Sequence, residues 1–193
     1  MTERTADYPI LPMFTERWSP RAFDARTISE EQLFTLFEAA RWAPSSLNVQ
    51  PWRFAYALRG DAHWEDFVST LVPGNQAWAA SAAALVFVIS ATQMEYKGQM
   101  TPNETHSFCA GSAWMSLALQ AHAMGLITHG MAGFDREAAN KVLNVGDGFH
   151  VNAAVAIGYQ GDKASLPESY REREIPSDRR PITESVFQGP MAG

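Results

Sequence analysis

Two apolar segments do most to limit how this chain can fold. Ala84 to Ser90 is a continuous apolar run, and Val151 to Ile157 is mostly apolar. A run of this kind is typical of a β-strand that is covered on both faces, so we expect two buried strands. Helical patterns separate the expected strands, so we expect a central sheet covered by helices, with strand directions that the pattern does not reveal. The sequence contains no Gly-x-Gly-x-x-Gly segment, which leaves a Rossmann fold without its main support.

Capping residues predict where helices begin and end. Ser29 and Gln32 form a capping box ahead of a helical apolar pattern that Pro44 ends. Asp61 is expected to cap a second helix, which Pro73-Gly74 stops. The further expected elements are a strand from Arg53 to Leu58, a long helix from about Ser107 to Met124 that Gly125 ends, a strand-like Leu126 to His129, and a helix from Asp135 to about Leu143.

Bulk composition narrows the class of protein. The 193 residues most simply form one domain, residues 1–193, with a core of about 14–160. The net charge of −6 and the lack of a long basic run make nucleic-acid binding unexpected. The longest apolar run, Ala82 to Ile89, is far shorter than the ~20 residues that cross a bilayer, so no membrane span is expected. A single cysteine, Cys109, and a polar start from Met1 to Tyr8 favour a cytoplasmic protein.

The C-terminal segment, about residues 161–193, differs from the rest. It is rich in proline and charge and has little periodicity, so it is either disordered or an extended arm that lies on another surface. Ile182, Val186 and Phe187 are apolar anchors that a purely solvated tail does not need. We therefore favour an arm that wraps a second subunit.

Two segments near the N-terminus suggest a binding site for a phosphorylated aromatic molecule. Arg17, Ser19 and Arg21 lie within five residues, and arginine forks with a hydroxyl can grip a phosphate. The alternative is a solvated basic turn. One helix later, the stretch from Ala43 to Trp52 is polar, has small residues and ends in an aromatic, which suits the face of a flat polar ring. The alternative there is a helix end followed by an ordinary turn.

Other candidate residues are weaker when each is taken alone. Gly130 to Phe134 could let a backbone approach a ligand closely, or could be a plain strand-to-helix loop. Arg179 and Arg180 could add charge at an anion site, or be a solvated pair. The five histidines show no metal-ligand spacing, so no metal site is expected. No side chain stands out as a catalytic nucleophile or acid–base group, Cys109 included, so an enzyme of this sequence would rely on a cofactor.

Taken together, these motifs resemble those of the FMN-dependent nitroreductase family. The resemblance is carried by Arg-Trp-Ser-Pro-Arg-Ala-Phe at 17–23 and by Ala-Pro-Ser-Ser followed by Asn-Val-Gln-Pro-Trp within 43–52. It covers nearly the whole chain, from about Phe14 to Phe187. Further matches in the family's order are Asn75, Ala132 to Asp135, Ala154 to Gly158 and Arg179-Arg180-Pro181. The implied fold is α+β: a three-layer α-β-α arrangement with a central, mostly antiparallel sheet and a C-terminal arm exchanged across a homodimer.

The resemblance also implies a role for each matched residue. Arg17, Ser19 and Arg21 would hold the phosphate, ribityl chain and pyrimidine edge of FMN, with Arg180 or Arg179 joining the phosphate. Asn75 would face the isoalloxazine edge, and the backbone of Ala132 and Gly133 would lie near flavin N5. Pro44, Ser45 and Ser46 would come from the neighbouring subunit. The expected cofactor-binding residues are Arg17, Trp18, Ser19, Arg21, Pro44, Ser45, Ser46, Asn48, Asn75, Ala132, Gly133, Arg179 and Arg180.

The implied activity is ping-pong transfer of hydride from NADH or NADPH through FMN to a nitroaromatic, a quinone or a similar electron-poor acceptor. Related flavin chemistry (reduction of enones or aldehydes, dehalogenation, oxygen-dependent flavin breakdown), a non-catalytic FMN sensor or carrier, and a flavin-free interaction domain stay open. Many relatives have an acidic residue at Ala132, lysine at Trp78 and aspartate at Cys109, and these departures bear on substrate preference and flavin tuning. The polar loop between Gln93 and Thr105 is expected to cover the substrate.

Overall fold

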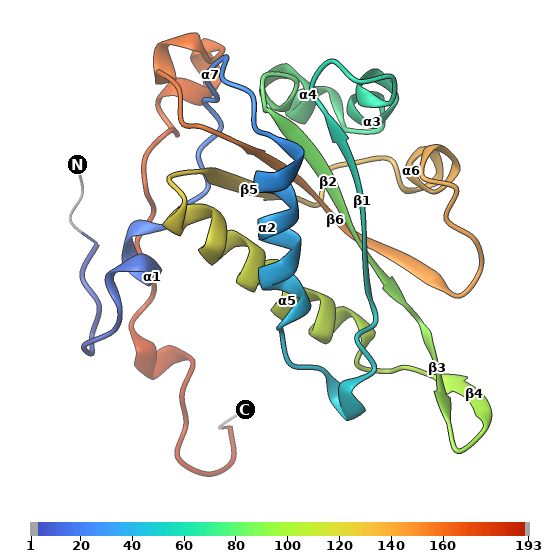
Figure 1. Cartoon of the computed structure of the whole chain (residues 1–193). Coiled ribbons are helices and arrows are strands. Elements are labelled where there is room, and N and C mark those ends of the chain that lie inside the picture. The colour runs from blue at the N-terminus through green and yellow to red at the C-terminus, as the bar shows by residue number, and fades with distance from the viewer. Residues whose placement is uncertain (1–3, 192–193) are drawn as a thin grey trace.

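The computed structural model describes residues 4–191 and has a four-stranded antiparallel sheet at its centre (Figure 1). The strands lie in the order β1-β2-β6-β5, so β2 (Ala84–Ala91) and β6 (Phe149–Gly158) are the inner pair. These are the two apolar runs noted in the sequence, and their prediction as buried strands is confirmed. Each neighbouring pair in this sheet is antiparallel, which supplies the strand directions that the pattern left open.

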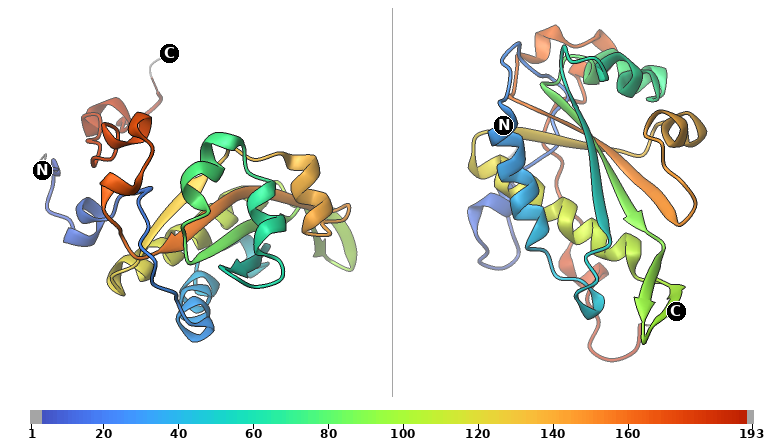
Figure 2. Two further views of the ribbon diagram at one scale, coloured as in Figure 1. Left: turned by 90° about the horizontal axis from the view of Figure 1, so that it is seen from above. Right: turned by 45° about the vertical axis from the view of Figure 1, so that its right-hand side comes forward.

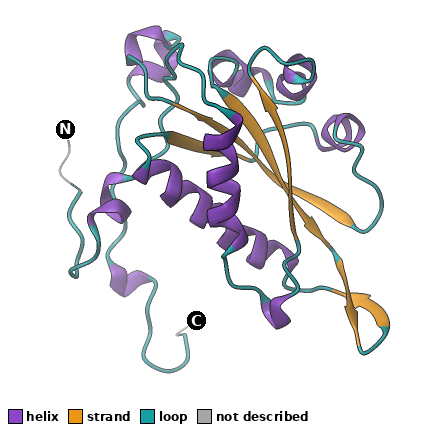
Figure 3. Ribbon diagram, in the orientation of Figure 1, coloured by secondary structure: helices purple, strands orange, loops and turns teal. Residues whose placement is uncertain are grey.

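Helices and a second, two-stranded sheet make up the rest of the regular structure (Figure 3). No helix within residues 4–191 combines the length and the apolar character that crossing a membrane requires. The other strands are β1 (Trp52–Leu58), β3 (Gln93–Tyr96), β4 (Gln99–Pro102) and β5 (Ile127–Met131), and the α-helices are α1 (Pro12–Glu16), α2 (Glu30–Arg41), α3 (Trp64–Ser69), α4 (Pro73–Ala79), α5 (His106–Ala123), α6 (Arg136–Val142) and α7 (Glu168–Arg171).

Helices cover both faces of the sheet, which produces three layers (Figure 2). On one face, Val86 of β2 packs in a buried cluster with Leu36 of α2 and Leu117 of α5. On the other face, Leu85 packs in a second cluster with Trp78 of α4 and with residues of α3 and α6. Successive residues of β2 thus point to opposite cores, as strand geometry requires. The predicted three-layer α+β fold with an antiparallel sheet is confirmed.

Two of the predicted helix starts are confirmed by their hydrogen bonds. The Ser29 hydroxyl accepts from the Gln32 backbone N–H at 3.1 Å, and the Gln32 side chain accepts from the Ser29 N–H at 3.0 Å. The Asp135 carboxylate accepts from the N–H groups of Glu137 and Ala138 at the start of α6. Both caps satisfy N–H groups that have no partner inside the helix.

The prediction for Asp61 and Pro73-Gly74 was wrong. Asp61 accepts from the backbone N–H groups of Leu58 and His63 at 2.8 Å, so it closes the turn after β1 instead of capping a helix, and α3 begins at Trp64. Pro73 opens a separate helix, α4. Proline suits the first helical position because the N–H that it lacks would have had no helical partner there.

The segment from Gln93 to Thr105 is not the irregular loop that we expected. It contains the β3–β4 hairpin, whose register pairs Gln93 with Pro102 and Tyr96 with Gln99. Lys97 and Gly98 form its turn with positive φ angles of 52° and 78°. Two residues of left-handed backbone are what a tight hairpin turn needs.

The C-terminal segment divides into two parts. Residues 160–174, including α7, pack on their own chain, and Leu166 is buried in the core. The rest is extended and passes beside the N-terminal segment, where the Ile182 N–H donates to the Asp7 carboxylate at 3.0 Å (Figure 1). Val186 and Phe187 are exposed. Parts of the predicted polar start (1–3) and of the arm's end (192–193) lie outside the described residues.

Candidate functional site

A basic pocket of about 320 Å³ gathers residues from three distant parts of the chain. Its lining is formed by Arg4, by Arg17, Trp18, Ser19 and Arg21 of the N-terminal segment, by His129 of β5, and by Arg173, Ile175, Ser177 and Arg179 of the C-terminal segment. The predicted cluster at 17–21 and one of the two predicted C-terminal arginines therefore meet in a single cavity. This arrangement can bind an anion with several guanidinium groups and hydroxyls.

Burial and nearby positive charge both act on Arg17 in this pocket. Burial, followed by repulsion from Arg4 and Arg179, lowers the pKa of the Arg17 guanidinium from its usual value. Its Nη1 donates to the Trp18 carbonyl oxygen at 3.0 Å and lies 3.5 Å from the Ser19 hydroxyl. Crowded guanidinium groups repel one another, and a bound anion would relieve that repulsion. The electrostatics of the pocket thus favour a negatively charged ligand.

The two C-terminal arginines are placed differently. Arg179 lines both the basic pocket and a neighbouring depression, whereas Arg180 lines only the depression, with Phe14 and Ile182. The sequence pattern gave no means of choosing between them. Of these two arginines, Arg179 is the one that is positioned within a single chain to contact an anion in the basic pocket.

His129 lies in the basic pocket, although the sequence gave no reason to select it. Its Nδ1 is 3.0 Å from the Pro20 carbonyl oxygen, and its ring is 4.6 Å from the Trp78 ring between centroids. Burial is the main cause that lowers its pKa. A histidine held neutral in this way donates one N–H to the Pro20 carbonyl oxygen and so holds the 17–21 segment against β5. Trp78 itself is only 2% exposed and belongs to the core.

Edge strand β5 connects the basic pocket to a second predicted group. After His129 the chain runs through Met131 to Ala132 and Gly133, and Gly133 lies up to about 13 Å farther at about 3.3 Å per residue. The Asn75 side-chain Nδ2 donates to the Gly133 carbonyl oxygen at 2.9 Å. The structure therefore brings Asn75 and Gly133 together, although they are far apart in sequence. The Ala132 side chain is exposed beside them.

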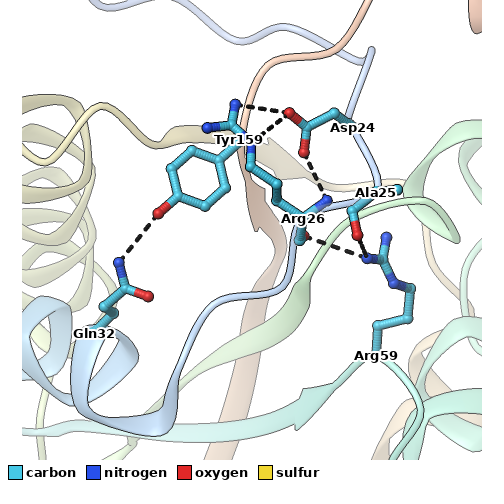
Figure 4. A network of polar contacts seen from close by, with 6 residues as sticks. All are labelled: Asp24, Ala25, Arg26, Gln32, Arg59 and Tyr159. Carbon is cyan, nitrogen blue, oxygen red and sulfur yellow. Dashed lines mark hydrogen bonds and ion pairs between the residues drawn. The ribbon is translucent and has the colours of Figure 1, made fainter.

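The chain that follows the 17–21 segment, at residues 24–26, is held by a polar network (Figure 4). The Arg26 guanidinium donates to Asp24 at 2.7 Å and lies over the Tyr159 ring, 3.9 Å from its centroid. Arg59 donates to the Ala25 carbonyl oxygen at 2.6 Å. This network holds the connection between the basic segment and α2 against the end of β6.

The predicted ring-binding stretch is not part of the same pocket. Pro44, Ser46 and Asn48 are exposed at the C-terminal end of α2, while the basic pocket lies near α7, toward the opposite end of that helix (Figure 1). Ser45 is partly buried there, and its hydroxyl accepts from the Gln50 N–H at 3.0 Å. One copy of the chain does not bring this stretch to the pocket.

This stretch has an unusual backbone. Leu47, Asn48 and Gln50 have φ angles of 51°, 55° and 48°, in the left-handed region that non-glycine residues rarely adopt. Such strain tends to cluster at functional sites. Leu47 is also 67% exposed, which is unusual for a leucine. The prediction for Trp52 was wrong: it is buried against the α2–α5 core, because strand β1 begins there and turns its indole inward.

A family model described as the Nitroreductase family matches residues 14–67 and 60–159. A solved structure described as an oxidoreductase containing FMN has a TM-score of 0.95 and 47% identity, and covers 100% of both chains. An uncharacterized 15.4 kDa protein of Mycolicibacterium smegmatis is 33% identical over 71% of this chain and 95% of its own. A protein of Ralstonia nicotianae named as an NADH dehydrogenase/NAD(P)H nitroreductase is 28% identical over 72% of this chain and 78% of its own length.

Proposed function

The chain belongs to the nitroreductase family, and from this premise we propose that it is a homodimeric oxidoreductase that uses FMN and NAD(P)H. The observation that carries the proposal is the course of β5, which joins the basic pocket at His129 to the Asn75–Gly133 pair. FMN has a phosphate at one end and a flat polar ring at the other, joined by an extended ribityl chain. The two groups along β5 match those two ends.

The residues present fit this cofactor. The crowded guanidinium groups around Arg17 suit a phosphate, and Ser19 adds a hydroxyl. At the other end, a Cβ on Gly133 would lie 2.7 Å from Asn75 Nδ2, so only glycine keeps the backbone this close to the amide. Trp18 would contact the phosphate end, and Arg179 would close the pocket from the C-terminal side, with Arg180 beside it.

Bound FMN supplies the redox chemistry, exchanging hydride and electrons at N5 between NAD(P)H and an electron-poor acceptor such as a nitroaromatic or a quinone. The chain's own residues bind and orient. Arg21 would hold the pyrimidine edge, Asn75 would keep Gly133 in place, and the backbone of Ala132 and Gly133 would lie beside N5. Fixing reactants in a productive geometry is worth up to about 7–11 kcal/mol.

We further propose that each site is shared between two copies of the chain. Pro44, Ser45, Ser46 and Asn48 would reach the flavin ring of the partner, because they are placed away from the pocket of their own chain. The exposed apolar side chains on the surfaces involved support this pairing. They include Trp42 and Leu47 beside this stretch, Phe108 and Met115 on α5, and Val186 and Phe187 of the expected wrapping arm, about residues 161–193.

Stopped-flow reduction tests the proposed activity. FMN-loaded protein is mixed anaerobically with NADH or NADPH, and the oxidised flavin absorbance is followed; a quinone or a nitroaromatic is then added. We expect the absorbance to bleach with at least one nicotinamide and to return with the acceptor. A flavin that stays oxidised with both nicotinamides would refute the reductase, and binding without turnover would indicate a flavin carrier.

A further inference from the structure

Two residues of the C-terminal segment, Tyr170 and Glu174, connect two separate segments of the proposed FMN site within one chain. They lie in and just after α7, the short helix that follows the sheet (Figure 1). One binds the segment that carries Arg21, and the other binds the start of α4, next to Asn75. The sequence gave no indication of either contact.

Glu174 binds the backbone of the basic segment. Its Oε1 accepts from the N–H groups of Arg21 at 2.6 Å and of Ala22 at 2.9 Å, and its Oε2 lies 3.7 Å from Arg21 Nη1. The Glu174 side chain is only 2% exposed. Within residues 4–191, Oε2 has no hydrogen-bond partner. A carboxylate that is this buried and serves two backbone donors fixes the chain at 21–22 in one position.

Tyr170 makes the second connection. Its hydroxyl donates to the Gly74 carbonyl oxygen at 2.7 Å, one residue before Asn75. Its ring lies 5.8 Å from the Arg21 guanidinium carbon. A Cβ at Gly74 would come within 3.0 Å of the Tyr170 hydroxyl, so the two elements are in close contact. Tyr170 therefore touches both the basic segment and the helix that presents Asn75.

We propose that Tyr170 and Glu174 are positioning residues that set the distance between Arg21 and Asn75 so that one FMN molecule can contact both. This inference rests on the proposed function. The same contacts also anchor the part of the chain that carries Arg173, Ser177 and Arg179. These three residues complete the basic pocket. The C-terminal segment thus has a role in its own subunit, separate from the wrapping of a partner.

Replacing Glu174 tests the proposal, with Glu172 as the matched control. Glu174→Ala leaves two N–H groups without their partner and releases Arg21, whereas Glu174→Gln keeps an oxygen that can accept both bonds. Glu172 is exposed two residues away, so Glu172→Gln makes the same change of charge without the contact. Tyr170→Phe removes only the bond to Gly74 and provides a milder second variant.

FMN affinity, measured by flavin fluorescence quenching, is the first readout. We expect Glu174→Ala to raise the Kd by on the order of tenfold or more, and Tyr170→Phe to raise it by about threefold to tenfold, in line with the loss of charged and neutral hydrogen bonds. Glu174→Gln should stay within about threefold of the unmodified protein. Glu172→Gln should have the same FMN Kd as the unmodified protein.

Amide hydrogen exchange of the FMN-free protein is the second readout, and it does not depend on flavin. The amides of Arg21 and Ala22 should exchange faster in Glu174→Ala, with those of β2 and β6 unchanged. Folded variants that bind FMN as tightly as the unmodified protein, or unchanged exchange at 21–22, would overturn the proposal. If the unmodified protein does not bind FMN at all, the proposed function fails instead; fast exchange at 21–22 would then still establish the contact.

Discussion

Asn75 donates its side-chain amide to the carbonyl oxygen of Gly133 at 2.9 Å and thereby joins the start of α4 to the chain that leaves edge strand β5. The Val72 N–H donates to the same oxygen at 3.1 Å. This pair lies just beyond the end of β5, and His129 in the middle of that strand lines the basic pocket around Arg17. The proposed function requires these two groups to be held at a fixed separation.

Gly133→Ala should disturb the pair directly. The added Cβ would lie 2.7 Å from Asn75 Nδ2 and 3.0 Å from Val72 Cγ2, so Asn75 has to move and the hydrogen bond weakens. Overpacking of this kind costs about 1–3 kcal/mol of unfolding free energy, which urea denaturation measures. Gly146→Ala is the control, since nothing lies within 4 Å of its added Cβ. Equal stability of the two variants would contradict the packing argument.

Arg179→Gln should weaken FMN binding by about tenfold or more, because hydrogen bonds to charged groups are worth about 1.5–3 kcal/mol. Arg180→Gln removes the same charge one residue away, outside the basic pocket, and should have a smaller effect. Titration with riboflavin, which lacks the phosphate, should show no difference between the variants. A larger loss with Arg180→Gln would reassign the phosphate contact to Arg180.

His129 should make the stability of the protein depend on pH. Burial lowers the pKa of its imidazole, so the unfolded chain takes up the proton first as the pH falls. Its contribution to the unfolding free energy is therefore complete above the ordinary histidine pKa of about 6.5 and is lost below it. In urea denaturation from about pH 7.5 to about pH 5, His129→Gln should lose less stability than the unmodified protein.

Exposed His63 provides the control for this experiment, and His63→Gln should keep the original slope. A smaller slope will remain in His129→Gln, because burial, Arg136 and His106 also lower the pKa of His150. Identical slopes for His129→Gln and the unmodified protein would show that His129 does not contribute.

Mixing two defective chains tests whether the site is shared. Arg17→Gln should damage the phosphate end, and Ser46→Trp should block the stretch that we propose to reach the partner's flavin ring. Each variant alone should bind FMN poorly. In a mixed dimer both defects fall in one site and the other site is intact, so equal mixing after subunit exchange should restore about a quarter of the sites. No recovery in confirmed mixed dimers would place both segments in one subunit's site.

The sequence predicted those parts of the fold that depend on local pattern. The apolar runs at 84–90 and 151–157 became β2 and β6, and Ser29 and Asp135 cap the helices that they were expected to cap. The prediction that Pro73 ends a helix was wrong because proline is common both after helices and at their first position. The β3–β4 hairpin was missed because its strands have four residues each and are mostly exposed, so the alternation of polar and apolar residues in them is too short to stand out.

The candidate site could be predicted where its residues form a local cluster or match a motif of the family. Arg17, Ser19 and Arg21 form a visible cluster, and they do meet in one pocket. Glu174 could not be found, because the backbone groups that it binds lie more than 150 residues away and a glutamate in a charged tail reads as solvated. His129 was hidden for a similar reason: its burial follows from its place in the sheet.

The visible absorption spectrum of the protein during titration with FMN tests the central claim most directly. We predict saturable binding of one FMN per chain to a dimer, with flavin bands shifted on binding and with weaker binding of riboflavin. Folded protein that leaves the FMN spectrum unchanged at saturating concentrations would contradict the account.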